Sequence, residues 1–298
     1  MSTQQTQQPP QGMGWIPDEL DPRDHIYAIP AARLMPSSSG VLRAALPSTK
    51  DLRGMMGLPG VYNQGSLGSC TANAVSFAYH CTELKQNNLK RISPSRLFLY
   101  YNTRALMGKT AVDSGAGIRT TMQAAAANGM CAESMWPYLT SRFADKPSAE
   151  CYVEGVKCVV NEYISVPQTL ENLKSVLVDG YPIAYGFNVY ASFDRVGLDG
   201  KMPIPNKATE KINGGHAVCI VGYDDTIRFD DATQLGGFIV RNSWGVLWGA
   251  AGYFYVPYSV MLDTGVCSSF WFIRQVSNPG DVVVPPFTCC DGCACIVC

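Results

Sequence analysis

Charged residues are scarce in this chain of 298 residues: they make up 16% of it, with 23 Lys plus Arg against 24 Asp plus Glu. The resulting net charge of −1 provides no electrostatic footprint for nucleic acid, and no basic cluster indicates a lipid-binding patch. No apolar run approaches the roughly 18 residues that a membrane-spanning helix needs. We therefore expect no nucleic-acid partner and no membrane span.

Histidine is rarer still, with 3 residues, whereas there are 12 cysteines. Seven cysteines are scattered without a CxxC pair, so the body of the chain resembles neither a disulfide scaffold nor a zinc module, and we expect no metal and no cofactor there. The other five crowd the last ten residues: Cys289, Cys290, Cys293, Cys295 and Cys298. This tail could be disulfide-linked, metal-binding or lipid-modified, or simply a flexible appendage.

The amino terminus has neither a basic opening nor an apolar core segment, so signal-peptide-dependent secretion is not expected. The cytoplasm is the default, although the cysteine content leaves non-classical export open. Residues 1–45 are rich in Gln, Pro and Ser, typical of an extended leader. Within them, Trp15 to Tyr27 carries bulky apolar groups that a mere tail would not require. This patch is either a surface strap or a segment that covers a cleft and inhibits the protein.

Apolar residues make up 47% of the chain, and a chain of this length can bury roughly 70–75% of its unfolded surface, so we expect a compact core. The sequence divides into the leader 1–45, a globular domain 46–280 and the Cys-rich tail 281–298. Within the leader, residues 36–40 are typical of a linker.

Helical patterns dominate the first half of the globular domain. Ser69 can cap one helix, Ser93 can cap a second with Pro94 at its first position, and Gly129 can end a third. Strands separated by Gly, Asp and Asn turns dominate the second half, apart from one helix at 170–178. We expect an α+β protein with a helical half at about 60–150 and an antiparallel β-rich half at about 155–280. The expected strands are Ile183–Val189, Ala217–Tyr223, Phe238–Arg241, Gly252–Val256 and Phe270–Arg274.

A Gly-rich loop, Gln64 to Cys70, delivers a cysteine to the first turn of a helix. A thiolate at that position would be stabilised by the positive end of the helix dipole, which lowers the thiol pKa and favours nucleophilic reactivity. Taken alone, a cysteine at a helix start is more often an ordinary buried thiol.

Two further motifs change that balance. His216 follows two glycines just before an apolar strand, and Asn242 lies beside Trp244 in a Gly-rich run. An amide oxygen can accept the imidazole N–H and orient the ring, while an indole can screen that bond from water. Each motif alone has a structural alternative, a core histidine in one case and an aromatic turn in the other.

Taken in order, the nucleophile loop, the Gly-His-Ala motif and the run from Asn242 to Tyr253 resemble the papain family of cysteine peptidases. The resemblance covers roughly Leu46 to Arg274, and the short leader is similar to that of bacterial-type members. His216 lies about 150 residues after the cysteine, as the family pattern has it. The interval to Asn242 is longer because of an apparent acidic hairpin insertion at 224–235. The resemblance implies a papain-like fold, with a cleft between a helical half and a β-barrel-like half.

The resemblance also implies a cysteine endopeptidase that cleaves polypeptides through an acyl-enzyme. Cys70 would be a thiolate beside protonated His216, which then serves as general acid and general base. Asn242 would orient His216, with Trp244 covering their bond, and Gln64 would form the oxyanion hole with the Cys70 N–H. A papain-like acyltransferase and a non-catalytic peptide-binding protein remain alternatives. We expect a monomeric zymogen whose own segment Trp15 to Tyr27 acts as inhibitor.

Some family features are replaced. Leu67 stands where the loop usually carries a second cysteine, and the Cys-Asn-Gly-Gly segment that holds its partner has become Asp113 to Gly117. Losing such bridges fits a reducing compartment, although Cys151 and Cys158 could still pair locally. By rough alignment, an open apolar pocket would accept Leu, Val or an aromatic as the second residue before the cut. The candidate substrate-binding residues are Gly115, Ala116, Gly186, Gly214, Gly215, Ala217 and Trp244.

Overall fold

The computed structural model describes residues 12–30, 34–37, 40–43, 46–86, 91–230 and 233–277, without the side chains of 34–37 and 40–43. The Cys-rich tail lies outside the described residues. Across these ranges, no helix combines the length and the apolar character needed to cross a membrane. Within the same ranges, no three His, Cys, Asp or Glu side chains gather as a metal site would require.

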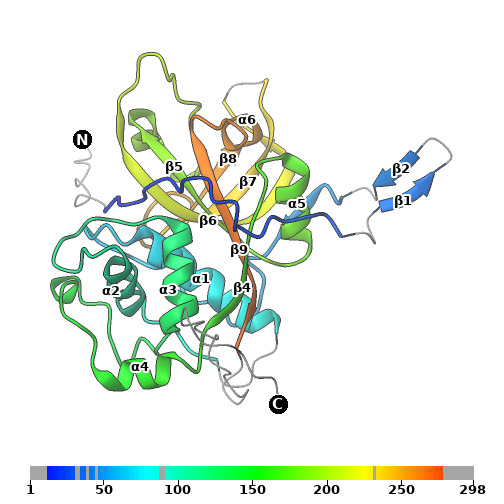
Figure 1. Cartoon of the computed structure of the whole chain (residues 1–298). Coiled ribbons are helices and arrows are strands. Elements are labelled where there is room, and N and C mark those ends of the chain that lie inside the picture. Colours follow the sequence, from blue (N-terminus) through cyan, green and yellow to red (C-terminus); the bar gives the residue numbers. More distant parts are fainter. Residues whose placement is uncertain are drawn as a thin grey trace, which may run out of the picture.

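Helices make up one half of the body (Figure 1). The central helix α1, Cys70–Lys85, is buried along almost its whole length, so its small side chains can meet helices and strands on all sides. Its cap residue Ser69 makes no capping bond, whereas Ser95 caps α2 by accepting the Phe98 N–H. The expected cap of α2, Ser93, is therefore wrong by two residues. The other helices are α2, Arg96–Leu106; α3, Ile118–Asn128; and α4, Ala149–Gly155.

A seven-stranded antiparallel sheet makes up the other half, in the order β4-β9-β5-β6-β7-β8, with β3 paired to β6. This confirms the expected α+β papain-like fold class. Beside the sheet lie α5, Leu170–Val178, and α6, Tyr258–Met261. The strands are β3, Thr49–Asp51; β4, Val160–Ser165; β5, Ile183–Tyr190; β6, Ile212–Arg228; β7, Leu235–Arg241; β8, Tyr253–Pro257; and β9, Cys267–Val276.

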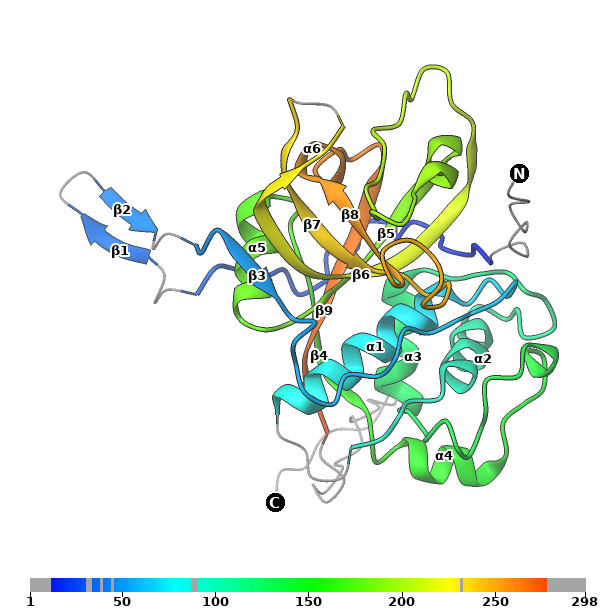
Figure 2. The same ribbon diagram turned by 180° about the vertical axis from the view of Figure 1, so that it is seen from behind.

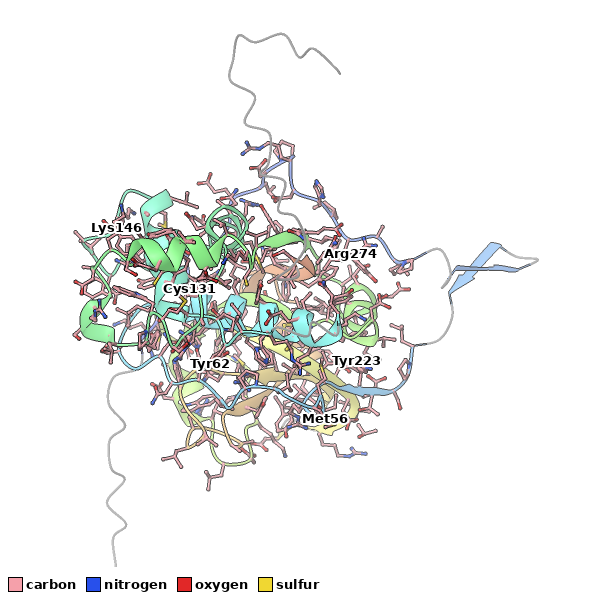
Figure 3. All side chains as sticks on the ribbon, turned by 90° about the horizontal axis from the view of Figure 1, so that it is seen from below. Met56, Tyr62, Cys131, Lys146, Tyr223 and Arg274 are labelled. Carbon is pink, nitrogen blue, oxygen red and sulfur yellow. The ribbon has the colours of Figure 1, made fainter. Side chains whose placement is uncertain are left out.

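Helices and sheet share one core. Side chains fill the space between α1 and the strands when the molecule is seen from below (Figure 3). Polar bonds also join the two halves: the Thr82 hydroxyl on α1 donates to the Ile273 carbonyl on β9 at 2.9 Å. The two halves are therefore held in a fixed relation, which fixes the relation of the side chains they carry.

The structure describes part of the leader. Its residues 12–27, which we call the strap, run across the line where the helices meet the sheet (Figure 1). Beyond the strap, the expected linker contributes to a two-stranded ladder of β1, Leu34–Ser37, and β2, Gly40–Arg43. This ladder stands away from the body (Figure 2). It joins the strap to β3 and so brings the chain back to the sheet.

Candidate active site

Cys70 is the first residue of α1 and has no exposed surface. Hydrogen bonds from Tyr138 fix the loop that precedes Cys70. The Tyr138 hydroxyl bonds the Ser69 hydroxyl at 2.5 Å and donates to the Gln64 carbonyl at 3.1 Å. Asn73 on α1 adds a bond to the Ser69 carbonyl at 3.0 Å. The loop therefore holds the sulfur at the start of the helix, as the sequence predicted.

His216 lies on β6, and its Nε2 makes a 2.8 Å hydrogen bond with Oδ1 of Asn242. The Trp244 ring stacks on the imidazole at a centroid distance of 4.6 Å and an interplanar angle of 23°. The other imidazole nitrogen, Nδ1, is buried and has no hydrogen-bond partner among the described residues. The Ala217 N–H, next along the same strand, is close enough to the sulfur of Cys70 to oppose the rise in the pKa of the thiol. The thiol thus adjoins the strand that carries the imidazole.

Gln64, in the loop that leads to Cys70, is fully buried. Its Nε2 donates to the Leu67 carbonyl at 2.9 Å and to the Gly12 carbonyl at 3.0 Å, while its Oε1 accepts the Ser243 hydroxyl at 2.5 Å. Because Ser243 holds the oxygen, the nitrogen is the atom turned toward the strap. Ser243 was missed from the sequence, although a hydroxyl next to Asn242 in the same motif was the available signal.

The strap covers these residues. Besides the bond from Gln64, Gly12 donates its N–H to the Gly65 carbonyl at 2.8 Å, and the Gly14 carbonyl accepts the Ala116 N–H at 2.7 Å. An added Cβ on Gly12 would come within 2.1 Å of the Leu67 carbonyl oxygen. One on Gly14 would lie equally close, at 2.1 Å, to the Gly68 carbonyl oxygen. Only glycine allows the strap backbone to approach this closely.

Trp15 lies among the predicted substrate-binding residues. Its N–H donates to the Gly215 carbonyl at 3.0 Å, and it pairs with Ala116 in a parallel bridge. Its indole lies against Gly186, where an added Cβ would come within 1.9 Å of a ring carbon. The indole is 6% exposed, so the pocket encloses it.

The remaining candidates are distributed around the strap. Gly115 faces Gly14, and Gly214 faces the Met13 side chain. Ala217 is fully buried next to His216. Trp244 differs from the others, because its observed ring contacts are with the imidazole, Phe193 and Trp248. The structure therefore brings six of the seven candidates to the strap or the thiol and leaves Trp244 as a cover for the imidazole.

Cys70 and His216 are both fully buried, and this burial shifts the pKa of each. Desolvation raises the pKa of the Cys70 thiol to about 11, although backbone N–H groups of Ala217 and Gly14 oppose the shift. Desolvation also lowers the pKa of His216 to about 4, against the bond from Asn242. In the covered site both shifts favour the neutral thiol and imidazole. The helix position that led us to expect a lowered thiol pKa is outweighed by the loss of water.

The cysteines of the body, Cys70 included, are free thiols: Cys70, Cys81, Cys131, Cys151, Cys158, Cys219 and Cys267. Cys151 and Cys158 thus remain unpaired here. Where the resemblance implied a lost bridge, Asp113 accepts the Gly68 N–H at 3.0 Å. A carboxylate therefore joins two loops beside the strap without a covalent bond.

Comparison with known proteins agrees with this geometry. The family model for papain family cysteine proteases matches residues 46–270. An uncharacterized peptidase C1-like protein of Acanthamoeba polyphaga mimivirus is 36% identical over 281 residues, covering 89% of this chain and 88% of that protein. Cathepsin J of Mus musculus is 27% identical over 241 residues, covering 80% of this chain and 69% of its own.

Solved structures show the same relationship. The crystal structure of xylellain, a cysteine protease from Xylella fastidiosa, has a TM-score of 0.77 and 35% identity, covering 91% of this chain and 97% of that one. Procathepsin B from Trypanosoma congolense, at 16% identity and a TM-score of 0.64 over 82% of this chain and 80% of its own, shares the fold. The chain therefore belongs to the papain family of cysteine proteases and is a cysteine endopeptidase that acts on polypeptides.

Proposed function

We propose that Cys70, His216, Asn242 and Gln64 carry the peptidase chemistry, and that the strap holds the enzyme in a latent state. The observation that supports the assignment most is the state of the imidazole. Asn242 fixes Nε2, which leaves Nδ1 as the nitrogen available to exchange a proton with the neighbouring thiol. We infer that Nδ1 faces the sulfur once the strap has left.

In the uncovered enzyme, the Cys70 proton moves to His216 and the thiolate attacks the peptide carbonyl carbon. His216 then donates that proton to the leaving amine, which departs and leaves a thioester on the sulfur. A water molecule, deprotonated by His216, hydrolyses the thioester and restores the thiol. The Gln64 Nε2 and the Cys70 N–H stabilise the oxyanion of each tetrahedral intermediate.

The latent state follows from two effects of the strap. The Gly12 carbonyl accepts a hydrogen bond from the Gln64 amide nitrogen, so this donor is not available to an oxyanion. Trp15 fills the predicted substrate pocket. The strap also removes water from the thiol and the imidazole, which disfavours their ion pair. Because this segment belongs to the same chain, the covered state needs no second subunit, and we propose that the protein is a monomer.

Replacing the sulfur tests the chemistry. Cys70→Ala should abolish cleavage of a fluorogenic peptide, since the residual rate of enzymes that lose their nucleophile is typically lower by about 10⁴-fold or more. The matched control is Cys81→Ala, which removes a buried thiol from the same helix. If the Cys70 variant retained the wild-type rate, another group would be the nucleophile.

Removing the leader tests the latency. Deletion of residues 1–45 should raise the rate toward a small peptide, and the deleted chain should titrate with one equivalent of an epoxide that alkylates thiols. Circular dichroism would show whether the body keeps its fold. An unchanged rate in a folded body would contradict the inhibitory role and leave the assignment of Cys70 intact.

A further inference from the structure

Beyond Trp15, the strap places a carboxylate in a site built for it. Oδ2 of Asp18 accepts the Trp271 Nε1–H at 2.9 Å and the Arg119 backbone N–H at 3.3 Å, while Oδ1 accepts the same backbone N–H at 3.2 Å. The Asp18 backbone N–H donates to the Ser269 hydroxyl at 3.0 Å. The carboxylate therefore accepts one side-chain N–H and one backbone N–H, both from the body.

The body, not the strap, shapes this site. Trp271 is 1% exposed, so its N–H has a fixed direction. Gly117, the cap residue of α3, has no side chain to satisfy the first turn of that 11-residue helix, and an added Cβ there would lie 2.5 Å from Oδ1 of Asp18. The carboxylate thus takes the place of the missing cap at the positive end of the helix. Ser269 presents its hydroxyl from a left-handed backbone, with a φ of 58°.

Charge on the two sides of the site is complementary. The strap carries four acids over seven residues, Asp18, Glu19, Asp21 and Asp24, against Arg23. They line a cavity of about 540 Å³ under the strap, to which the body contributes a single ionisable residue, Arg119, among the described lining residues. The Arg119 guanidinium donates to Asp24 at 2.5 and 2.9 Å. The body wall is therefore positive and rich in hydrogen-bond donors where the strap is negative.

The site also lies along the same path as the pocket for Trp15. Asp18 is three residues further along the strap, which corresponds to roughly 10 Å of extended chain. Ile16 between them donates its N–H to the Ala116 carbonyl at 3.0 Å. A peptide that replaced the strap would cross both places.

We propose that the site formed by Gly117, Arg119, Ser269 and Trp271 is a carboxylate-binding subsite for substrates. The strap runs from the thiol loop at Gly12 through Trp15 to Asp18, whereas a substrate whose second residue before the cut fills the Trp15 pocket passes that pocket in the opposite direction. The subsite therefore takes an Asp or Glu side chain two or three positions before the residue that enters the Trp15 pocket. This inference rests on the proposed function, because it requires that substrate and strap use the same path. The enzyme then prefers acidic segments, of which its own strap is one.

Binding to the full chain tests the subsite apart from catalysis. The chain would carry Gly12→Ala and Gly14→Ala to loosen the strap, Asp18→Ala to empty the subsite and Cys70→Ala to prevent turnover. Fluorescent peptides with Phe for the Trp15 pocket would carry Asp, Ala or Lys two and three positions earlier. We expect the Asp peptides to bind about tenfold more tightly than the Ala peptides, and the Lys peptides to bind most weakly. Equal affinities, or no binding of any peptide, would overturn the inference.

Two substitutions should remove the preference. Gly117→Ala fills the space beside Oδ1, and Trp271→Phe removes a donor while keeping an aromatic ring. Each should bring the Asp peptide to within about twofold of the Ala peptide, whereas Gly54→Ala, whose Cβ would meet nothing within 4 Å, should keep the full preference. A preference that survives both substitutions would place the acidic side chain elsewhere and overturn the inference.

Hydrolysis by the same chain with Cys70 restored separates this inference from the proposed function. If all peptides are cut with equal kcat/KM, the subsite is wrong while the catalytic assignment stands. If the Asp peptide binds preferentially and none is cut, the subsite stands while the catalytic assignment fails.

Discussion

The two ends of the strap are held by different physics. Its inner part, residues 12–16, lies against the thiol loop through backbone bonds and glycine contacts, and the Trp15 indole is enclosed. Its outer part, residues 17–27, is anchored over a cavity by the carboxylates of Asp18 and Asp24, and beyond them His25 and Tyr27 make backbone bonds with Ser165. Leu20 in this part is fully exposed.

The difference has a consequence for release. Close backbone packing tolerates no added atom, because a misplaced methyl group must move a whole chain segment. The outer carboxylates are held by individual hydrogen bonds, and the loss of one such bond typically costs only about 1 kcal/mol. We therefore expect the inner strap to determine latency and the outer strap to adjust it. The following changes test that division.

The largest effect should come from Gly12→Ala with Gly14→Ala in the full chain. Both methyl groups would overlap carbonyl oxygens of the thiol loop, so the inner strap should leave and water should return to Cys70. If its pKa falls from about 11 to the usual value near 9, the thiolate at pH 7 increases about 100-fold. The pH dependence of iodoacetamide labelling measures this shift directly.

Gly54→Ala is the matched control, since its added Cβ would meet nothing within 4 Å. It should label as slowly as the wild type at pH 7. Should the double variant also label slowly, with an inflection that stays near pH 11, the strap would not be what raises the thiol pKa. The inner strap would then not be the part that determines latency.

Local signals in the sequence predicted the elements that position this site. The helix 118–128 ends before Gly129, as that glycine indicated, and the helix 170–178 has its expected bounds. Asn242 lies beside His216, as its motif indicated. The helix after Ser93 begins later, because the nearby Ser95 provides the cap. Short-range chemistry was thus predicted to within a turn.

Contacts that join distant residues could not be predicted in this way. Asp18 was part of a noted patch, but its partner Trp271 is 253 positions away and nothing in either local sequence indicates the pairing. The raised pKa of the covered Cys70 thiol could not be predicted locally either. Its helix position is a local property, whereas the strap that lies against its loop is more than fifty residues earlier.

An intermediate effect should come from the wall of the pocket. Gly186→Ala places a methyl group where the Trp15 indole lies, so it should weaken the inner strap and narrow the pocket at once. Overpacking typically costs about 1–3 kcal/mol, so we expect roughly a 10-fold rise in activity toward peptides with Ala at the second position before the cut. For peptides with Phe there, the rise should be absent. The ratio of the two kcat/KM values is the measurement.

A rise that is equal for both peptides would mean that the indole and the substrate use different pockets. The inner strap would then inhibit without filling the substrate pocket, because Trp15 would only anchor the strap to the body. Gly54→Ala again provides the background, and circular dichroism would show that the overall secondary structure is retained.

The smallest effect should come from the outer strap. Asp18→Ala leaves the Trp271 Nε1–H and the Arg119 N–H without their acceptor, and the loss of such a bond is typically worth about 1 kcal/mol. We expect roughly a 5-fold rise in peptide cleavage at pH 7, measured beside Arg23→Ala. Arg23 has an exposed side chain that bonds Asp21 of the strap, so its replacement should leave the rate unchanged.

Acidification should sharpen this last result. Burial raises the pKa of Asp18 when the strap is docked, even though Trp271 and Arg119 oppose the shift. A carboxyl whose docked pKa lies above its released value takes up a proton on docking. Its hydrogen bonds therefore gain a pH-dependent addition that is fully present below the released pKa and is lost as the pH rises through the docked one. The rate ratio of Asp18→Ala to wild type should therefore increase as the pH falls from 7 toward 4. A ratio that decreased instead would show that the ionised carboxylate binds the body more tightly. Protonation of Asp18 at low pH would then weaken the docking of the outer strap.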